Sequence, residues 1–213
     1  IEQFFSVNYV DRGDLFEGLS IWENEEYREI QGTYPVIFLS FAHIKEDNYQ
    51  ATREKIGKLI NAIFVDFEYL LDSEKLSIDE KEIIANMKKT TNDADVTLSL
   101  NFLSKFLYKH HNKKAIILLD EYDTPMQEAY VNGYWDELVS FTRSLFNSTF
   151  KTNPYLERGL MTGITRVSKE SIFSDLNNLE VVTTTSDKYA TSFGFTEEEV
   201  FVALDEFGLS SEK

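Results

Sequence analysis

The sequence predicts an α/β fold in which strands and helices alternate and the sheet is mainly parallel. Two observations support this class. Continuous apolar runs at residues 34–41 and 113–121 are typical of strands that are buried on both faces, as in parallel sheets. The segments that follow them place apolar residues at steps of three and four, which is the pattern of one buried helix face. This order favours parallel strands joined by right-handed crossovers.

The first half of the chain contains one of these strands and several helices. Ile1–Phe5 predicts the last turn of an apolar helix, and an acidic loop follows at 11–29. After the first strand, periodic apolar residues predict a long helix from 56 to 70. A charged stretch at 77–89 predicts a shorter helix, and the apolar spacing of Leu98–Leu107 predicts another.

The second half begins with the strand at 113–121, which ends in two acids, and continues with a helix at 135–146. A third strand is predicted at Gly159–Ile164 and a fourth at Val181–Thr185. The last predicted helix begins at a capping box and is closed by a glycine, through Thr196, Glu199 and Gly208.

Composition excludes several classes of protein. The 213 residues contain no cysteine, so a disulfide scaffold, a cysteine nucleophile and a thiolate metal site are excluded. The net charge of −16 disfavours an autonomous module that binds nucleic acid or anionic lipid. No apolar run approaches the ~18 residues that a membrane span needs, and no signal peptide opens the chain. We therefore expect a cytoplasmic protein.

Polar residues follow three of the predicted strands, at 40–43, 120–123 and 162–166. Ligands of open parallel sheets bind beyond the carboxyl ends of the strands. The second place is the most informative, because five apolar residues lead directly into Asp120 and Glu121. An aspartate there can hold Mg²⁺ through water, and the glutamate can orient or deprotonate an attacking water. The alternative is a strand that simply ends in polar loop residues.

Three separated motifs then occur in order: Leu118–Pro125 (LLDEYDTP), Thr162–Lys169 (TGITRVSK) and Phe193–Val200 (FGFTEEEV). Together they closely resemble the bacterial AAA-ATPase-like family, P-loop ATPases that are often fused to a C-terminal restriction-endonuclease-like nuclease domain. The resemblance runs from Ile1 to about Leu209. It implies a P-loop NTPase-like, three-layer α/β/α fold, with the ATPase core at 1–190 and the start of a helical segment at 191–213.

The resemblance also implies roles for individual residues. Asp120 and Glu121 correspond to the Walker B pair, the metal-side aspartate and the catalytic glutamate. Thr165 and Arg166 lie where a sensor-like polar pair faces the γ-phosphate. The implied cofactors are Mg²⁺ and ATP, and the implied partners are ATP together with a protein partner or a fused nuclease domain.

One feature of the family is missing from the sequence. The Gly-rich loop ending in Gly-Lys-Ser, which wraps phosphates with backbone N–H groups, does not occur. The nearest string, Ile56–Leu59, falls inside the long predicted helix, whereas such a loop must follow a strand and open a helix. In the family the loop lies just before the helix that Ile1–Phe5 would finish. We therefore expect a domain truncated at its N-terminal strand and P-loop, which does not hydrolyse ATP by itself.

Two other functions remain open at this stage. One is a regulatory protein-interaction module with a degenerate nucleotide site, which the acidic surface and the missing loop suggest. The other, ranked last, uses Asp120, Glu121 and Asp123 as a metal cluster for phosphodiester hydrolysis. No lysine is spaced to complete a nuclease motif there, and the net charge of −16 opposes nucleic-acid binding.

Four features allow two interpretations each. Asp123 is either a third carboxylate of the site or part of an ordinary Asp-Thr-Pro turn. Arg166 is either an arginine finger supplied in cis or a surface arginine that pairs with acids. His43 either senses nucleotide or is a plain polar strand end. The basic cluster at 105–114 either faces nucleic acid or complements the dipole of its own helix.

Overall fold

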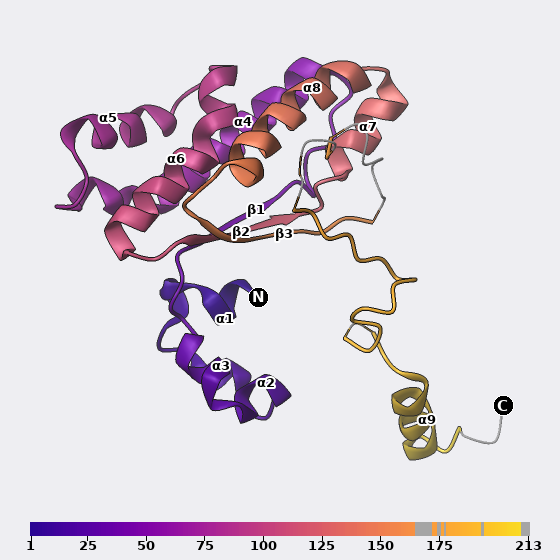
Figure 1. Ribbon diagram of the computed structural model, residues 1–213. Helices are drawn as coiled ribbons and strands as arrows, with labels where there is room; N and C mark the ends of the chain where they lie inside the picture. Colours follow the sequence, from indigo (N-terminus) through magenta and orange to yellow (C-terminus); the bar gives the residue numbers. More distant parts are fainter. Residues whose placement is uncertain (165–171, 174–175, 177, 193, 210–213) are drawn as a thin grey trace. The chain divides into compact units, whose positions relative to one another are not determined.

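The computed structural model describes residues 1–164, 172–173, 176, 178–192 and 194–209, which form two compact units, Ile1–Asn177 and Asn178–Lys213. Among these described residues, the first unit contains the sheet and most of the helices, and the second contains the helix at Glu197–Glu206 (Figure 1). Thr165 and Arg166 lie outside the described residues.

The sheet consists of three parallel strands in the order β1-β2-β3: β1 (Val36–Ser40), β2 (Ala115–Asp120) and β3 (Leu156–Met161). The α/β class and the parallel sheet are confirmed. The third strand begins at Leu156 rather than at the predicted Gly159. The prediction missed its start because Glu157 and Arg158 are polar and interrupt the apolar pattern. All three carboxyl ends meet at one edge of the sheet.

Long helices cover one face of this sheet (Figure 1). Helix α4 (Tyr49–Asp66) contacts β1, α6 (Asp93–His111) contacts β2, and α8 (Trp135–Phe146) packs on both helices. Asn48 and Asn92 cap the first two with their side chains. These helices match the predicted ones, and the string at 56–59 lies inside α4 as expected. No helix in the described part of the chain combines the length and the apolar character that a membrane crossing requires.

Shorter helices complete this layer. Helix α5 (Ile78–Met87) begins at the predicted charged stretch, with Ser77 and Glu80 forming a capping box. Helix α7 (Thr124–Asn132) was not predicted, because Asp-Thr-Pro is also turn chemistry; here the proline occupies the first turn of a helix, where its missing N–H costs nothing. A 3₁₀-helix (Glu68–Asp72) follows α4 and a π-helix (Asn147–Lys151) follows α8.

The N-terminal region consists of short helical turns. The predicted helical turn at the start is α1 (Glu2–Phe5). The expectation of an acidic loop at 11–29 was wrong, because Asn24 caps the start of α3 and the ring of Phe16 packs against Phe4, with centroids 5.0 Å apart. The remaining turns are two 3₁₀-helices and two α-helices, at Val7–Tyr9, Gly13–Phe16, α2 (Ser20–Glu23) and α3 (Glu25–Ile30).

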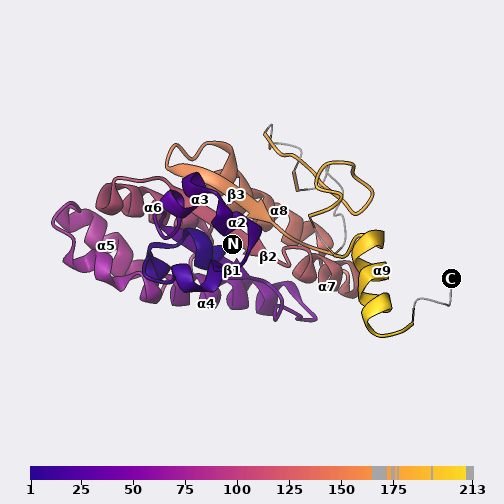
Figure 2. The same ribbon diagram turned by 90° about the horizontal axis from the view of Figure 1, so that it is seen from below.

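The second face of the sheet is covered to different extents along the strands. Figure 2 views this face, from the side opposite α4, α6 and α8. Near the amino ends of the strands, Phe5 and Tyr34 pack against a buried apolar cluster. Toward the carboxyl ends, Phe38 and Leu160 remain 44% and 42% exposed. A third layer over this part of the sheet stays a prediction.

The second unit contains α9 (Glu197–Glu206), which begins at the predicted capping box of Thr196 and Glu199. The predicted fourth strand at Val181–Thr185 was wrong, since these residues form no strand. Thr183 exchanges hydrogen bonds with Ser186 instead, and such local side-chain bonds compete with strand pairing. The core boundary at residue 190 stays a prediction.

Candidate active site

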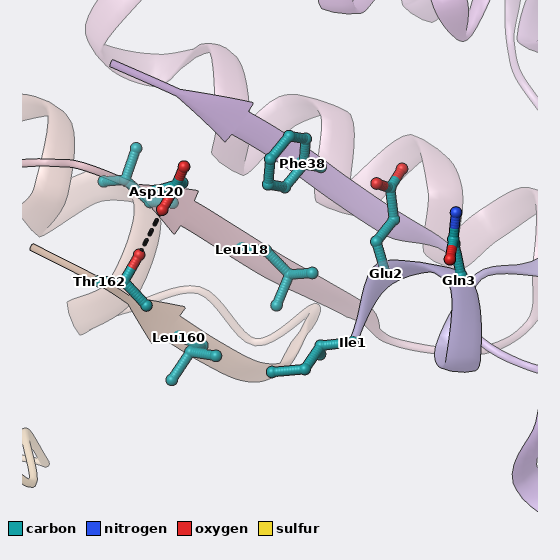
Figure 3. Close-up of a pocket in the computed structure, with 9 residues that line it drawn as sticks. Ile1, Glu2, Gln3, Phe38, Leu118, Asp120, Leu160 and Thr162 are labelled. Atoms are coloured by element: carbon teal, nitrogen blue, oxygen red, sulfur yellow. Dashed lines mark hydrogen bonds between the residues drawn. The ribbon is translucent and has the colours of Figure 1, made fainter. Parts of the chain in front are cut away.

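Asp120 lies at the carboxyl end of the central strand, between polar side chains from both neighbouring strands. Its Oδ2 accepts a hydrogen bond from the Ser40 hydroxyl at 3.2 Å. Its Oδ1 accepts one from the Thr162 hydroxyl at 2.7 Å, which Figure 3 shows as a dashed line. The parallel register causes this arrangement, because Ser40 is the strand partner of Asp120 and the Thr162 N–H donates to Leu119 O at 2.9 Å. The carboxylate is therefore oriented by hydroxyls on both sides.

Glu121 has an unusual backbone conformation. Its φ of 49° lies in the left-handed region, which costs a residue with a side chain roughly 1–2 kcal/mol. Its carboxylate accepts a hydrogen bond from the Thr124 hydroxyl in the first turn of α7 at 3.0 Å. Residues held in such conformations concentrate at functional sites. The turn thus places the second acid of the pair in a fixed position beside Asp120.

Asp123 is buried, with 1% of its surface exposed, behind this edge. Its Oδ2 accepts hydrogen bonds from the backbone N–H of Ile164 at 3.1 Å and from the Gln127 side-chain amide at 2.9 Å. Asp123 therefore contacts the segment after β3 and the first turn of α7. It is not an exposed turn residue.

The oxygen atoms at this edge fit a magnesium ion. Asp120 supplies a carboxylate, and Ser40 and Thr162 supply hydroxyls, which are hard donors of the kind that Mg²⁺ prefers. Within the described residues, no three histidine, cysteine or acidic side chains gather where they could hold a metal ion. This excludes the three-acid cluster with Glu121 and Asp123. A single carboxylate suits Mg²⁺, which keeps several waters and takes further oxygens from phosphates.

An apolar hollow of about 350 Å³ extends from this edge along the second face of the sheet. Its floor is formed by one side chain from each strand, Phe38, Leu118 and Leu160 (Figure 3). The start of the chain lines the far end, and Asp120 and Thr162 line the near end. The candidate site therefore opens onto an apolar surface.

Sequence analysis identified the strand ends but missed the roles of Ser40 and Thr162. Pairing the last residue of each strand across the expected parallel sheet would have placed both beside Asp120. His43 follows β1 and is exposed, and its main-chain oxygen accepts a hydrogen bond from Lys55 at 3.0 Å. The predicted pair Thr165 and Arg166 lies outside the described residues.

The basic cluster at 105–114 makes contacts within its own unit. Lys105 and Lys109 lie 3.1 Å and 2.7 Å from the carboxylate of Glu80, which is 7% exposed. Burial opposes ionisation of Glu80, but the hydrogen bonds from Lys109, from the Ser77 N–H and from Lys105 outweigh it and lower its pKa to about 2. These contacts support the interpretation that the cluster serves the folded structure.

The two histidines of this cluster are also engaged. His110 Nδ1 lies 2.8 Å from the Ser73 hydroxyl, and His111 Nε2 lies 2.8 Å from the Tyr69 hydroxyl. Burial, with the charges of His110 and Lys75, lowers the pKa of His111 to about 4, and burial raises the pKa of Tyr69 to about 12. His111 and Tyr69 are therefore both neutral near pH 7 and contribute to the packing of the folded structure.

Comparisons with known proteins identify the family of the chain. Residues 1–173 match the model of the family described as Predicted AAA-ATPase. An uncharacterized protein in the vnfD 5′ region of Azotobacter chroococcum mcd 1 is 28% identical over 89 residues, which cover 41% of this chain and 17% of that relative. No solved structure matches the chain. On the family match, the chain belongs to the predicted AAA-ATPase family.

Proposed function

We propose that this chain is the metal-binding and water-positioning part of a bacterial, cytoplasmic ATPase that binds and hydrolyses Mg-ATP in the intact protein. The observation that carries the proposal is Asp120 at the tip of the central strand, oriented by Ser40 and Thr162 and followed by Glu121 in a left-handed conformation. The family match over residues 1–173 supports a nucleotide-binding role for this edge.

Each residue has a distinct task in this proposal. Asp120 holds Mg²⁺ through water, with Ser40 and Thr162 orienting its carboxylate. A Mg²⁺ ion held by Asp120 would neutralise charge on the transferred phosphoryl group. Glu121 orients or deprotonates the attacking water. Thr165 and Arg166 contact the γ-phosphate.

The phosphate cradle must come from elsewhere in the intact protein, since residues 1–213 contain no Gly-x-x-x-x-Gly-Lys-Ser/Thr loop. The exposed side chains of Phe38 and Leu160 offer such a segment an apolar surface beside Asp120. A helix packed there, joined to a strand that pairs at an edge of the sheet, would complete a three-layer P-loop NTPase-like fold. Without it, the 213 residues alone do not hydrolyse ATP.

A second candidate is a regulatory module that binds another protein and whose nucleotide site has lost its chemistry. The same apolar hollow, in a chain with a net charge of −16, favours it. A separate protein or a fused nuclease domain would then occupy the surface. The two candidates differ in whether nucleotide binds at all.

Calorimetric titration of Mg-ATP into the intact protein and into residues 1–213 separates them. We expect binding by the intact protein that is lost when Mg²⁺ is chelated, and no binding by residues 1–213. Absence of binding to the intact protein would overturn the ATPase proposal and favour the regulatory module.

A further inference from the structure

We propose that Asp123 is a positioning residue, which fixes the segment after β3 against the turn after β2 and thereby keeps Thr162 in place beside Asp120 in the proposed ATPase. The inference rests on the proposed function. It starts from a buried carboxylate that lies outside the Walker B pair and joins three elements: the turn after β2, the start of α7 and the segment that leaves β3.

The segment after β3 depends on this carboxylate. The sheet ladder ends where the Tyr122 N–H donates to Thr162 O at 3.1 Å. One step further, the Ile164 N–H donates to Asp123 Oδ2 at 3.1 Å. The side chain of Ile164 is 89% exposed, so packing of that side chain does not hold the segment in place. The hydrogen bond from the Ile164 N–H to Asp123 therefore holds the segment after β3 against the turn after β2, beyond the point where backbone pairing ends.

Gly163 shows how closely the segment passes Asp123. A Cβ atom added at Gly163 would lie 2.4 Å from Asp123 Oδ1 and 3.0 Å from the Tyr122 ring. Gly163 is not among the glycines with a positive φ, so space rather than backbone conformation requires a glycine here. Asp123 and Gly163 therefore pack directly against each other, and Asp123 Oδ1 occupies the space that a side chain at residue 163 would need. We call this pair of residues the lock.

Hydrogen bonds accompany the burial of Asp123. Burial of a carboxylate is costly unless hydrogen bonds replace its water, and the Ile164 N–H and the Gln127 amide do so. Asp123 also directly precedes α7, where the helix dipole favours an anion.

The consequence for catalysis follows from the order of residues along this segment. Thr162, which orients Asp120, comes directly before the lock. Loss of the lock should therefore misplace Thr162 and the carboxylate of Asp120 more than it weakens nucleotide binding. A misplacement of about 1 Å typically lowers the rate about 10²-fold.

The test is a double-mutant cycle on the intact protein with Asp123→Ala and Gly163→Ala, with Asp123→Asn as the conservative variant. Each alanine variant should lower kcat for Mg-ATP by about 10- to 100-fold and change the Mg-ATP Kd by less than about threefold. The double variant should resemble Asp123→Ala, because removal of the carboxylate makes room for the new methyl group. Asp123→Asn keeps an oxygen acceptor and should retain most of the rate.

Gly57→Ala in α4 is the matched control, since the nearest atom to its Cβ lies 3.9 Å away, and it should not change kcat. Hydrogen exchange at the Ile164 amide supplies a readout that does not depend on activity. It should accelerate in Asp123→Ala and stay near the wild-type rate in Asp123→Asn. Additive effects of the two alanine substitutions, or unchanged exchange, would overturn the lock. Faster exchange at the Ile164 amide together with a wild-type kcat would show that the Asp123 contact is merely structural and would overturn the catalytic part of the proposal. An intact wild-type protein without ATPase activity would refute the proposed function, and the exchange measurement alone would then test the lock.

Discussion

Two acidic residues of the first unit, Glu80 and Asp120, have opposite environments. Glu80 is buried between two lysines and the capped start of α5, which hold its pKa at about 2. Asp120 instead accepts hydrogen bonds from the neutral hydroxyls of Ser40 and Thr162, and no cation pairs with it in the described part of the chain. The charge of Glu80 is neutralised within the fold, whereas that of Asp120 remains available to a bound cation.

This difference distinguishes an acidic residue that stabilises the fold from one that is available to a ligand, without reference to sequence motifs. A carboxylate that is paired with lysines contributes to the free energy of unfolding, and its removal leaves buried positive charge. A carboxylate that is oriented only by hydroxyls at the carboxyl edge of a parallel sheet lies where ligands bind. Substitutions in the two groups should therefore affect different properties of the protein.

The largest effect is expected at Glu121. Glu121→Gln in the intact protein should lower kcat for ATP hydrolysis by about 10²–10⁴-fold, because an amide cannot accept a proton from the attacking water. The Mg-ATP Kd should change little. Steady-state turnover and calorimetric binding of the same preparation check this prediction, and a loss of binding equal to the loss of rate would contradict the assigned role.

Asp120→Asn should act on the metal. The neutral amide attracts Mg²⁺ less strongly, and loss of a group that holds a metal through water typically weakens its binding about 10- to 100-fold. Titration of ATPase activity against Mg²⁺ at saturating ATP should therefore show a higher half-saturating concentration. An unchanged Mg²⁺ dependence would show that Asp120 does not face the ion.

Glu80→Gln should act on stability alone. Glutamine keeps the capping box, so the substitution mainly removes the charge that faces Lys105 and Lys109, and we expect a loss of about 2 kcal/mol at pH 7 after allowance for the partly exposed lysines. Because the folded pKa of Glu80, about 2, lies below its ordinary value of 4.5, the wild-type advantage is present above pH 4.5 and disappears as the pH falls toward 2. Urea unfolding between pH 7 and pH 3 measures it.

The control for this substitution is Glu82→Gln, which makes the same charge change at an exposed position on the same helix. It should leave the urea midpoint unchanged. If Glu80→Gln and Glu82→Gln behaved alike, the lysine contacts of Glu80 would contribute nothing measurable.

The smallest effect is expected at Thr162. Thr162→Val removes the hydroxyl that donates to Asp120 at 2.7 Å and nearly preserves the side-chain shape. A hydrogen bond to a charged group contributes about 1.5 kcal/mol, so catalytic efficiency at limiting Mg²⁺ should fall by about tenfold or less. Turnover at saturating Mg²⁺ should recover most of the rate, and failure to recover would assign Thr162 a more direct role.

Much of the fold could be predicted because apolar patterns determine it. Continuous apolar runs predicted β1 and β2, and three- and four-residue spacing predicted α4, α6 and α8. Two local features of the sequence led to wrong predictions. Proline in the first turn of α7 has the same sequence signature as a loop, and the threonines at 183–185 form hydrogen bonds within a turn rather than a strand.

The site was predicted only in part. Asp120 and Glu121 follow from the strand end and the family motif, but the hydroxyl partners of Asp120 depend on strand register. The left-handed φ of Glu121 and the burial of Asp123 depend on backbone geometry and on contacts about 40 residues away, which composition and spacing do not encode.

The most direct test of the account measures Mg-ATP turnover and the thermal midpoint together for the intact wild-type protein, Glu121→Gln and Glu80→Gln. The account predicts that Glu121→Gln loses turnover and keeps its midpoint, while Glu80→Gln lowers the midpoint and keeps the turnover of its folded fraction. Turnover in Glu121→Gln equal to that of the wild type, or an intact wild-type protein without turnover, would contradict it.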